Sequence, residues 1–89
     1  MNELSILFIK DGSSDWTAQC LEYDIAAQGA TIKEAMSMFQ NVLASEFAYS
    51  LEKQGKPTLE GIPSAPQYYW RLFDEAADLM LSLTIFCSA

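Results

Sequence analysis

The sequence predicts an α+β domain in which one long helix packs on a three-stranded antiparallel sheet, followed by a C-terminal helix. Residues 4–29 hold three short runs of strand-forming side chains, separated by turn residues. In residues 31–55, apolar side chains recur every three or four positions, which is the period of a helix with one buried face. Because the strands come first and the helix follows, we expect two layers in the order β-β-β-α. The 89 residues form one domain, with a core at 4–55, a loop at 56–65 and the C-terminal helix at 66–83.

The three predicted strands occupy residues 4–9, 16–22 and 25–29. A cluster of turn residues that includes Asp11 and Gly12 separates the first strand from the second, as in a hairpin with a longer loop. The second strand alternates imperfectly and opens on Trp16, which we expect to anchor the core against the long helix. The third strand is brief and leads directly into that helix.

Thr31 and Glu34 fit a capping box at the start of the long helix. In this motif the threonine hydroxyl accepts from the glutamate N–H, and the carboxylate reaches back to the threonine N–H. Gly55 can adopt the left-handed conformation that ends a helix, and Pro57 lies just beyond it. The helix therefore spans about six turns. The residues expected on its apolar face are Ile32, Ala35, Met36, Phe39, Val42, Leu43, Phe47 and Leu51.

The C-terminal helix is expected to begin at Pro66, because proline is favoured at the first position of a helix. Apolar side chains cover most of its circumference, which is typical of a buried helix. Two interpretations are open: the helix packs across a boundary between subunits, or it packs on the far side of its own sheet. Residues 84–89 fit either a short strand or a frayed tail.

The composition is that of a small acidic domain. Hydrophobic residues make up 51% of the chain, which is generous for a small monomer and favours an oligomer or a bound partner. Twelve Asp and Glu against five scattered Lys and Arg give a net charge of −7. Binding to phosphates needs a basic patch, so this charge argues against nucleic acid as a direct ligand. An acidic surface serves solubility, or it steers a basic partner protein.

Three features predict a cytoplasmic location without membrane association. The N-terminal residues lack the basic region of a signal peptide, and the apolar run at 5–9 is too short for one. No stretch reaches the ~20 apolar residues of a membrane span. Cys20 and Cys87 lie far apart among apolar residues, so we expect buried thiols rather than a disulfide.

The sequence offers little for catalysis. The chain has no histidine, which removes the usual general base at neutral pH and any histidine-containing metal site. Its glycines are isolated, so there is no glycine-rich phosphate loop. Glu22 with Asp24, or Asp11 with Asp15, could hold Mg²⁺ as in a metal-dependent hydrolase, but acidic residues in turns are far more often solvated. We therefore expect no enzymatic activity, no cofactor and no metal.

Aromatic residues gather at the start of the C-terminal helix and are the best binding candidates from residue chemistry. Tyr68, Tyr69, Trp70 and Phe73 are too many to be buried together in so small a domain. Aromatic and Met side chains are enriched at protein interfaces. The candidate interface residues are Glu22, Asp24, Tyr69, Trp70, Phe73 and Met80.

Residues 16–35, with the sequence WTAQCLEYDIAAQGATIKEA, resemble the HicB-like antitoxin family. Members have a strand that opens on an aromatic residue, an acidic turn, a short strand ending in Gln-Gly, and a helix starting Thr-x-x-Glu-Ala. The matching residues here are Glu22, Gln28, Gly29, Thr31, Glu34 and Ala35. Asn41 falls where many members have a helix asparagine, whereas Leu21 replaces the proline before the turn and the Pro-Gly of many members is absent. The resemblance covers residues 4–55.

The resemblance implies a partial ribonuclease-H-like core without nuclease activity. Family members bind and neutralise a small basic toxin, an mRNA-cleaving protein with a double-stranded-RNA-binding-like fold. Many also carry a C-terminal DNA-binding module, whereas this chain has one acidic, aromatic helix after Pro66. We therefore expect a single-domain, toxin-binding member that self-associates as a dimer or tetramer. The alternative is an orphan homo-oligomeric interaction module whose main contact surface is the aromatic helix.

Overall fold

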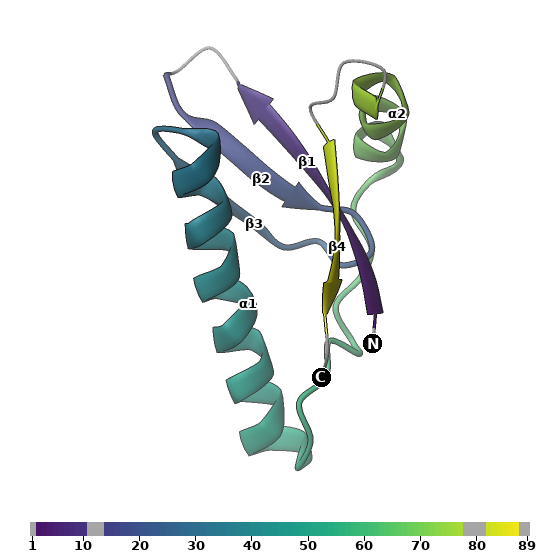
Figure 1. The fold of residues 1–89 in the computed structure, drawn as a ribbon. Coiled ribbons are helices and arrows are strands. Elements are labelled where there is room, and N and C mark those ends of the chain that lie inside the picture. Colours follow the sequence, from purple (N-terminus) through teal and green to yellow (C-terminus); the bar gives the residue numbers. More distant parts are fainter. Residues whose placement is uncertain (1, 11–13, 78–81, 88–89) are drawn as a thin grey trace.

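The computed structural model describes residues 2–10, 14–77 and 82–87, which form one antiparallel sheet with a helix on each face (Figure 1). In chain order the elements are β1 (Asn2–Lys10), β2 (Trp16–Cys20), β3 (Ala26–Gly29), α1 (Ile32–Gln54), α2 (Gln67–Ala77) and β4 (Ser82–Cys87). The strand order β3-β2-β1-β4 places β1 and β2 in the middle of the sheet and β3 and β4 at its edges.

The predicted α+β class is confirmed. Strands β1, β2 and β3 pair antiparallel, α1 is the long helix that follows them, and α2 is a C-terminal helix. The predicted extent of the C-terminal helix, 66–83, is too long. α2 ends at Ala77, and both Ser82 and Leu83 belong to β4.

β4 is a fourth strand that the predicted three-stranded sheet lacks. Of the two alternatives for the end of the chain, the short strand is the one present, and it begins at Ser82, before the predicted position 84. β4 pairs with β1 in a continuous antiparallel register from Asn2↔Cys87 to Leu7↔Ser82. Without β4, β1 would have an unpaired edge, so the pairing satisfies backbone groups that the three-stranded sheet leaves open.

β1 is buried on both faces. Leu4, Ile6 and Phe8 join the main core together with residues of β2 and α1. Leu7 points to the opposite face, because side chains alternate along a strand, and it is only 2% exposed. Burial on both sides explains why residues 6–9 of this strand are all apolar rather than alternating.

Both ends of α1 are capped at the predicted residues, but of the two hydrogen bonds of the expected capping box only the one to the Thr31 hydroxyl is present. The Thr31 hydroxyl accepts from the Glu34 backbone N–H at 3.0 Å. Gly55 has a φ of 79°, and its N–H donates to the Leu51 carbonyl at 3.0 Å, which closes the last turn. Because a side chain at that φ is strained, glycine is the favoured residue there.

The apolar face of α1 differs from the predicted one at its two ends. Phe39 and Leu43 are buried as expected, but Ile32 is 38% exposed and Leu51 is 53% exposed. At the C-terminal end the buried position is Ser50. Its hydroxyl donates to the Phe47 carbonyl at 2.9 Å and accepts from the Thr58 N–H at 2.8 Å. The buried face of α1 thus includes the polar residue Ser50, which a search for regularly spaced apolar residues cannot detect.

Gly29 lets β3 and α1 approach closely. A Cβ at this position would lie 2.4 Å from the Ala35 backbone nitrogen and 2.7 Å from the Glu34 carbonyl carbon. Distances this short do not occur for real side chains, so the glycine of the Gln-Gly pair at the end of β3 is required for a local steric reason. The glycine allows α1 to fold directly back over β3.

α2 packs on the face of the sheet opposite α1 (Figure 1). Ile9 and Thr17 lie beside Tyr69 and Leu72 of α2, and both alternate with neighbours that face α1. The described part of α2 therefore packs on its own sheet, which is one of the two interpretations left open by the sequence. α1 lies over β2 and β3, whereas α2 lies over β1 and β4.

Candidate protein-binding surfaces

Glu22 lies in the turn between β2 and β3, where its carboxylate completes the sheet. Oε1 accepts from the backbone N–H of Ser5 at 2.7 Å, while the Ser5 carbonyl accepts from the Leu21 N–H at 3.1 Å. Glu22 is half-buried. Its carboxylate therefore has a structural partner and is not a free acidic group at the surface.

Asp24 is exposed and holds the same turn in place. Its Oδ1 accepts from Gln19 Nε2 at 2.9 Å, and its backbone N–H donates to the Pro63 carbonyl at 2.7 Å. A second bond, from the Ala65 N–H to the Leu21 carbonyl at 2.8 Å, ties the segment before α2 to the turn. Both predicted acidic candidates thus organise the turn, and their carboxylates bind different partners.

The aromatic candidates of α2 are partly covered. Tyr69, Trp70 and Phe73 are half-buried, whereas Tyr68, which was named in the aromatic cluster, is 59% exposed. The Tyr68 and Tyr69 rings meet edge-to-face, with centroids 5.4 Å apart and planes at 69°. Met80, the remaining candidate on the predicted helix, lies outside the described residues.

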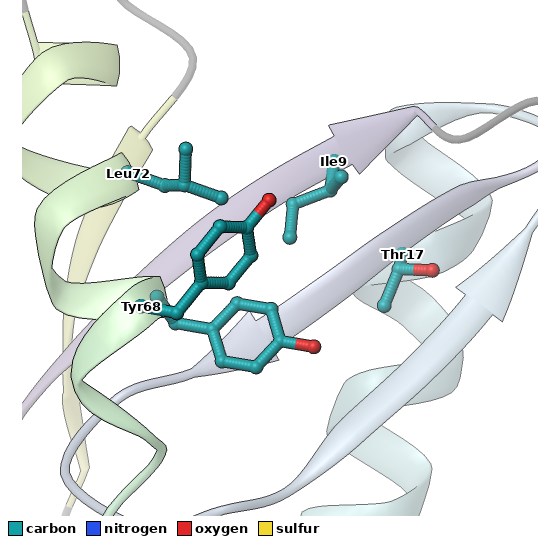
Figure 2. Close-up of a pocket in the computed structure, with 5 residues that line it drawn as sticks. Ile9, Thr17, Tyr68 and Leu72 are labelled. Carbon is teal, nitrogen blue, oxygen red and sulfur yellow. The ribbon is translucent and has the colours of Figure 1, made fainter.

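A groove of about 230 Å³ opens where α2 meets the sheet. We call it the tyrosine groove, and its lining residues are Ile9, Thr17, Tyr68, Tyr69 and Leu72. Figure 2 shows Tyr68 and Leu72 reaching from α2 over the sheet, where Ile9 and Thr17 lie on β1 and β2. None of the five side chains is charged, so the groove suits an uncharged apolar or aromatic group with hydrogen-bonding atoms at its rim.

A second groove, of about 220 Å³, lies where the chain reverses after α1. We call it the acidic groove, and its lining residues are Glu46, Tyr49, Ser50, Gln54, Thr58, Glu60, Gly61 and Ile62. Tyr49 is 60% exposed. The nearest ion pair joins Lys56 to Glu60 at 3.9 Å, and both of its side chains are largely exposed. An exposed pair at that distance binds weakly and leaves the Glu60 carboxylate accessible to a competing cation.

Cys20 is buried in the main core and forms no disulfide. Burial raises the pKa of its thiol, and the Glu22 carboxylate, whose Oε1 lies 3.9 Å from Sγ, raises it further. Both effects disfavour the thiolate, which is the nucleophilic form. Cys20 is therefore a core residue, as predicted, and the side chain of Cys87 lies outside what the structure describes.

The part of the chain that the structure describes offers no cluster of three or more His, Cys, Asp or Glu side chains that could hold a metal ion. Glu22 and Asp24, one of the two pairs considered for Mg²⁺, are each engaged with a backbone or side-chain nitrogen. Asp11, of the other pair, lies outside the described residues. Among the described helices, none is long and apolar enough to cross a membrane.

The sequence located the aromatic cluster but missed the acidic groove. Glu46 and Glu60 are 14 positions apart, and they line one groove only because the chain reverses at Gly55. Tyr49, an aromatic residue outside the apolar face of α1, was the one sequence signal for this site.

Comparison of the chain with models of protein families, with curated proteins and with solved structures finds no match.

Proposed function

We propose that the chain is a non-enzymatic protein-binding domain of the HicB-like antitoxin type, which neutralises a small basic RNA-cleaving toxin. The residues that carry the resemblance support this proposal by their positions. Gly29 sits at the close approach between β3 and α1, and Thr31 caps the helix through the Glu34 N–H. They occupy the strand-to-helix junction of a β-β-β-α core, which is the arrangement that the resemblance implies.

The acidic groove is the observation that carries the proposal. Two carboxylates, Glu46 and Glu60, line it together with the exposed ring of Tyr49. A Lys or Arg side chain is attracted both to carboxylates and to the face of an aromatic ring. The amine of Lys53 already lies 5.9 Å from the centroid of the Tyr49 ring, so a partner's cation would replace it over that ring. The groove thus fits a basic side chain of a partner.

The net charge of the chain adds a long-range attraction for a basic protein to the local attraction of the acidic groove. At −7 the chain steers a basic protein towards it, and association between opposite charges is fast at low salt and weakens as salt screens them. In this function the acidic surface would cover the basic RNA-binding face of the toxin.

A pull-down from the lysate of the source cell tests the proposal. The tagged chain is expected to retain a small basic protein at low salt and to lose it at high salt, as read by mass spectrometry. Glu46→Gln with Glu60→Gln should weaken retention at least tenfold. The control, Glu52→Gln with Glu75→Gln, makes the same change in net charge, from −7 to −5, at exposed positions outside the groove. Equal loss in both double variants would place the binding elsewhere.

The alternative function is that of an orphan homo-oligomeric interaction module. The uncharged tyrosine groove favours it, because two acidic copies repel one another and associate most easily through uncharged surface. Here Tyr68→Ala should abolish assembly, whereas the acidic-groove variants should leave it unchanged. The molecular masses of these variants in solution, measured by light scattering, test this function, and a Tyr68→Ala variant that stays assembled would contradict it.

A further inference from the structure

β4 presents one whole edge of the sheet that is paired with no other strand among the described residues. In Figure 1 it crosses in front of β1. Its six residues, Ser82–Cys87, pair with β1 on the inner side without a bulge. The outer side is therefore a straight row of backbone donors and acceptors.

The hydrogen bonds of β1 identify which backbone N–H and carbonyl groups of β4 point away from the sheet. Ser5 directs both its N–H and its carbonyl towards the β2 side. Its neighbours Leu4 and Ile6 therefore direct theirs towards β4, where they face Ile85 and Leu83. Residues alternate along a strand, so the backbone groups that point outward are those of Ser82, Thr84 and Phe86.

This edge lacks the features by which proteins prevent edge-to-edge pairing. Ser82–Cys87 contains no charged residue and no proline, and natural edge strands use both to block association. The opposite edge differs: β3 has four residues, and α1 folds directly over it. β4 is thus the longer and less protected of the two edges.

We propose that a second copy of this chain pairs with β4 in an antiparallel, two-fold arrangement. The proposal is independent of the proposed toxin partner. With Thr84 opposite its own copy and Ser82 opposite Phe86, two four-stranded sheets join into one continuous sheet of eight strands. The net charge of each copy, −7, favours contact at an uncharged strip over contact anywhere in the acidic surface. β4 is such a strip.

Amide hydrogen exchange of the unmodified protein, measured by NMR at several concentrations, tests the pairing directly. As light scattering shows the mass doubling, exchange at Thr84 and Phe86 should slow at least tenfold. Leu83 and Ile85, which bond to β1, should be protected at every concentration. A dimer in which Thr84 and Phe86 exchange as fast as in the monomer would overturn the proposal, as would a chain that stays monomeric at millimolar concentration.

Substitutions at Thr84 give a second, independent test. Thr84→Pro removes an outward N–H from each copy and leaves the bonds to β1 in place, so the dissociation constant should rise roughly tenfold to a hundredfold. Thr84→Val keeps the N–H and should dimerise like the parent chain. Thr84→Glu places like charges opposite one another and should dissociate the dimer at low salt. If Thr84→Pro dimerises as tightly as Thr84→Val, β4 is not the interface.

The response to salt separates this assembly from binding of a basic partner. Salt screens the repulsion between two copies of equal charge, so self-association should strengthen as salt rises. Association with a basic protein should weaken over the same range. Self-association that weakens with salt would contradict pairing through an uncharged strip.

Discussion

The Glu22 carboxylate accepts a hydrogen bond from the Ser5 backbone N–H at 2.7 Å, at the point where the pairing of β1 with β2 ends. Ser5 is 8% exposed, so water cannot readily replace this acceptor. The side chain thus extends the sheet by one hydrogen bond beyond the last paired residues. Glu22, which the sequence predicts to be a surface acid available to a partner, is thus part of the hydrogen bonding of the sheet.

Glu22→Ala should destabilise the fold by about 1–3 kcal/mol, because it leaves the Ser5 N–H buried without an acceptor. Glu22→Gln keeps an oxygen at the same reach and should cost less than about 1 kcal/mol. Urea unfolding of the two variants measures the difference. Equal losses in both variants would mean that the charge, rather than the hydrogen bond, carries the effect.

Gly29→Ala should destabilise the fold by about 3 kcal/mol, because the new Cβ meets the backbone of Glu34 and Ala35. Gly61→Ala is the control: its φ of 96° strains any side chain, but nothing lies within 4 Å of the new atom. That strain should cost about 1–2 kcal/mol. Thermal unfolding ranks the two variants, and a smaller loss for Gly29→Ala would disprove the close approach of β3 and α1.

Ser50→Ala should cost about 1–2 kcal/mol, because the Thr58 N–H loses its acceptor in a half-buried site. Ser45→Ala, on the exposed side of the same helix, removes only a bond from Oγ to the Asn41 carbonyl. It should change stability by less than about 0.5 kcal/mol. Chemical denaturation measures both, and similar values would show that Ser50 does not hold the loop onto α1.

The burial of Cys20 predicts a loss of stability at alkaline pH. Its pKa in the folded chain is raised above the ordinary value of 9.0. Between the two values the unfolded chain binds fewer protons than the folded one, so stability is full below about pH 9 and falls as pH rises above it. Unfolding free energies measured from pH 7 to pH 10 should fall less steeply for Cys20→Ala than for the parent chain. Parallel slopes would exclude the thiol as the cause.

The sequence predicts the N-terminal two thirds of this fold because the signals there are local. Turn residues separate the strands, Thr31 and Gly55 mark the ends of α1, and the apolar period fixes its direction of burial. Each of these features depends on neighbours within a few positions. Short-range stereochemistry alone is therefore enough to predict them.

Local sequence patterns do not predict β4 or the acidic groove. The apolar residues of α2 continue into those of β4, so no change of period marks the strand, and its pairing depends on the free edge of β1. Glu46 and Glu60 meet only because the chain reverses after α1. Ser50 is buried through its bond to Thr58, which a pattern of apolar residues cannot show. All three features arise from tertiary contacts.

The most direct test of the proposed antitoxin function is an RNA-cleavage assay with the small basic protein that co-purifies with the chain at low salt. The proposal predicts that an equimolar amount of the chain reduces cleavage to background. It also predicts that the variant with Glu46→Gln and Glu60→Gln requires at least tenfold more protein for the same effect. Undiminished cleavage in a tenfold excess of the chain, or the absence of any such basic protein from the low-salt eluate, would contradict the proposal.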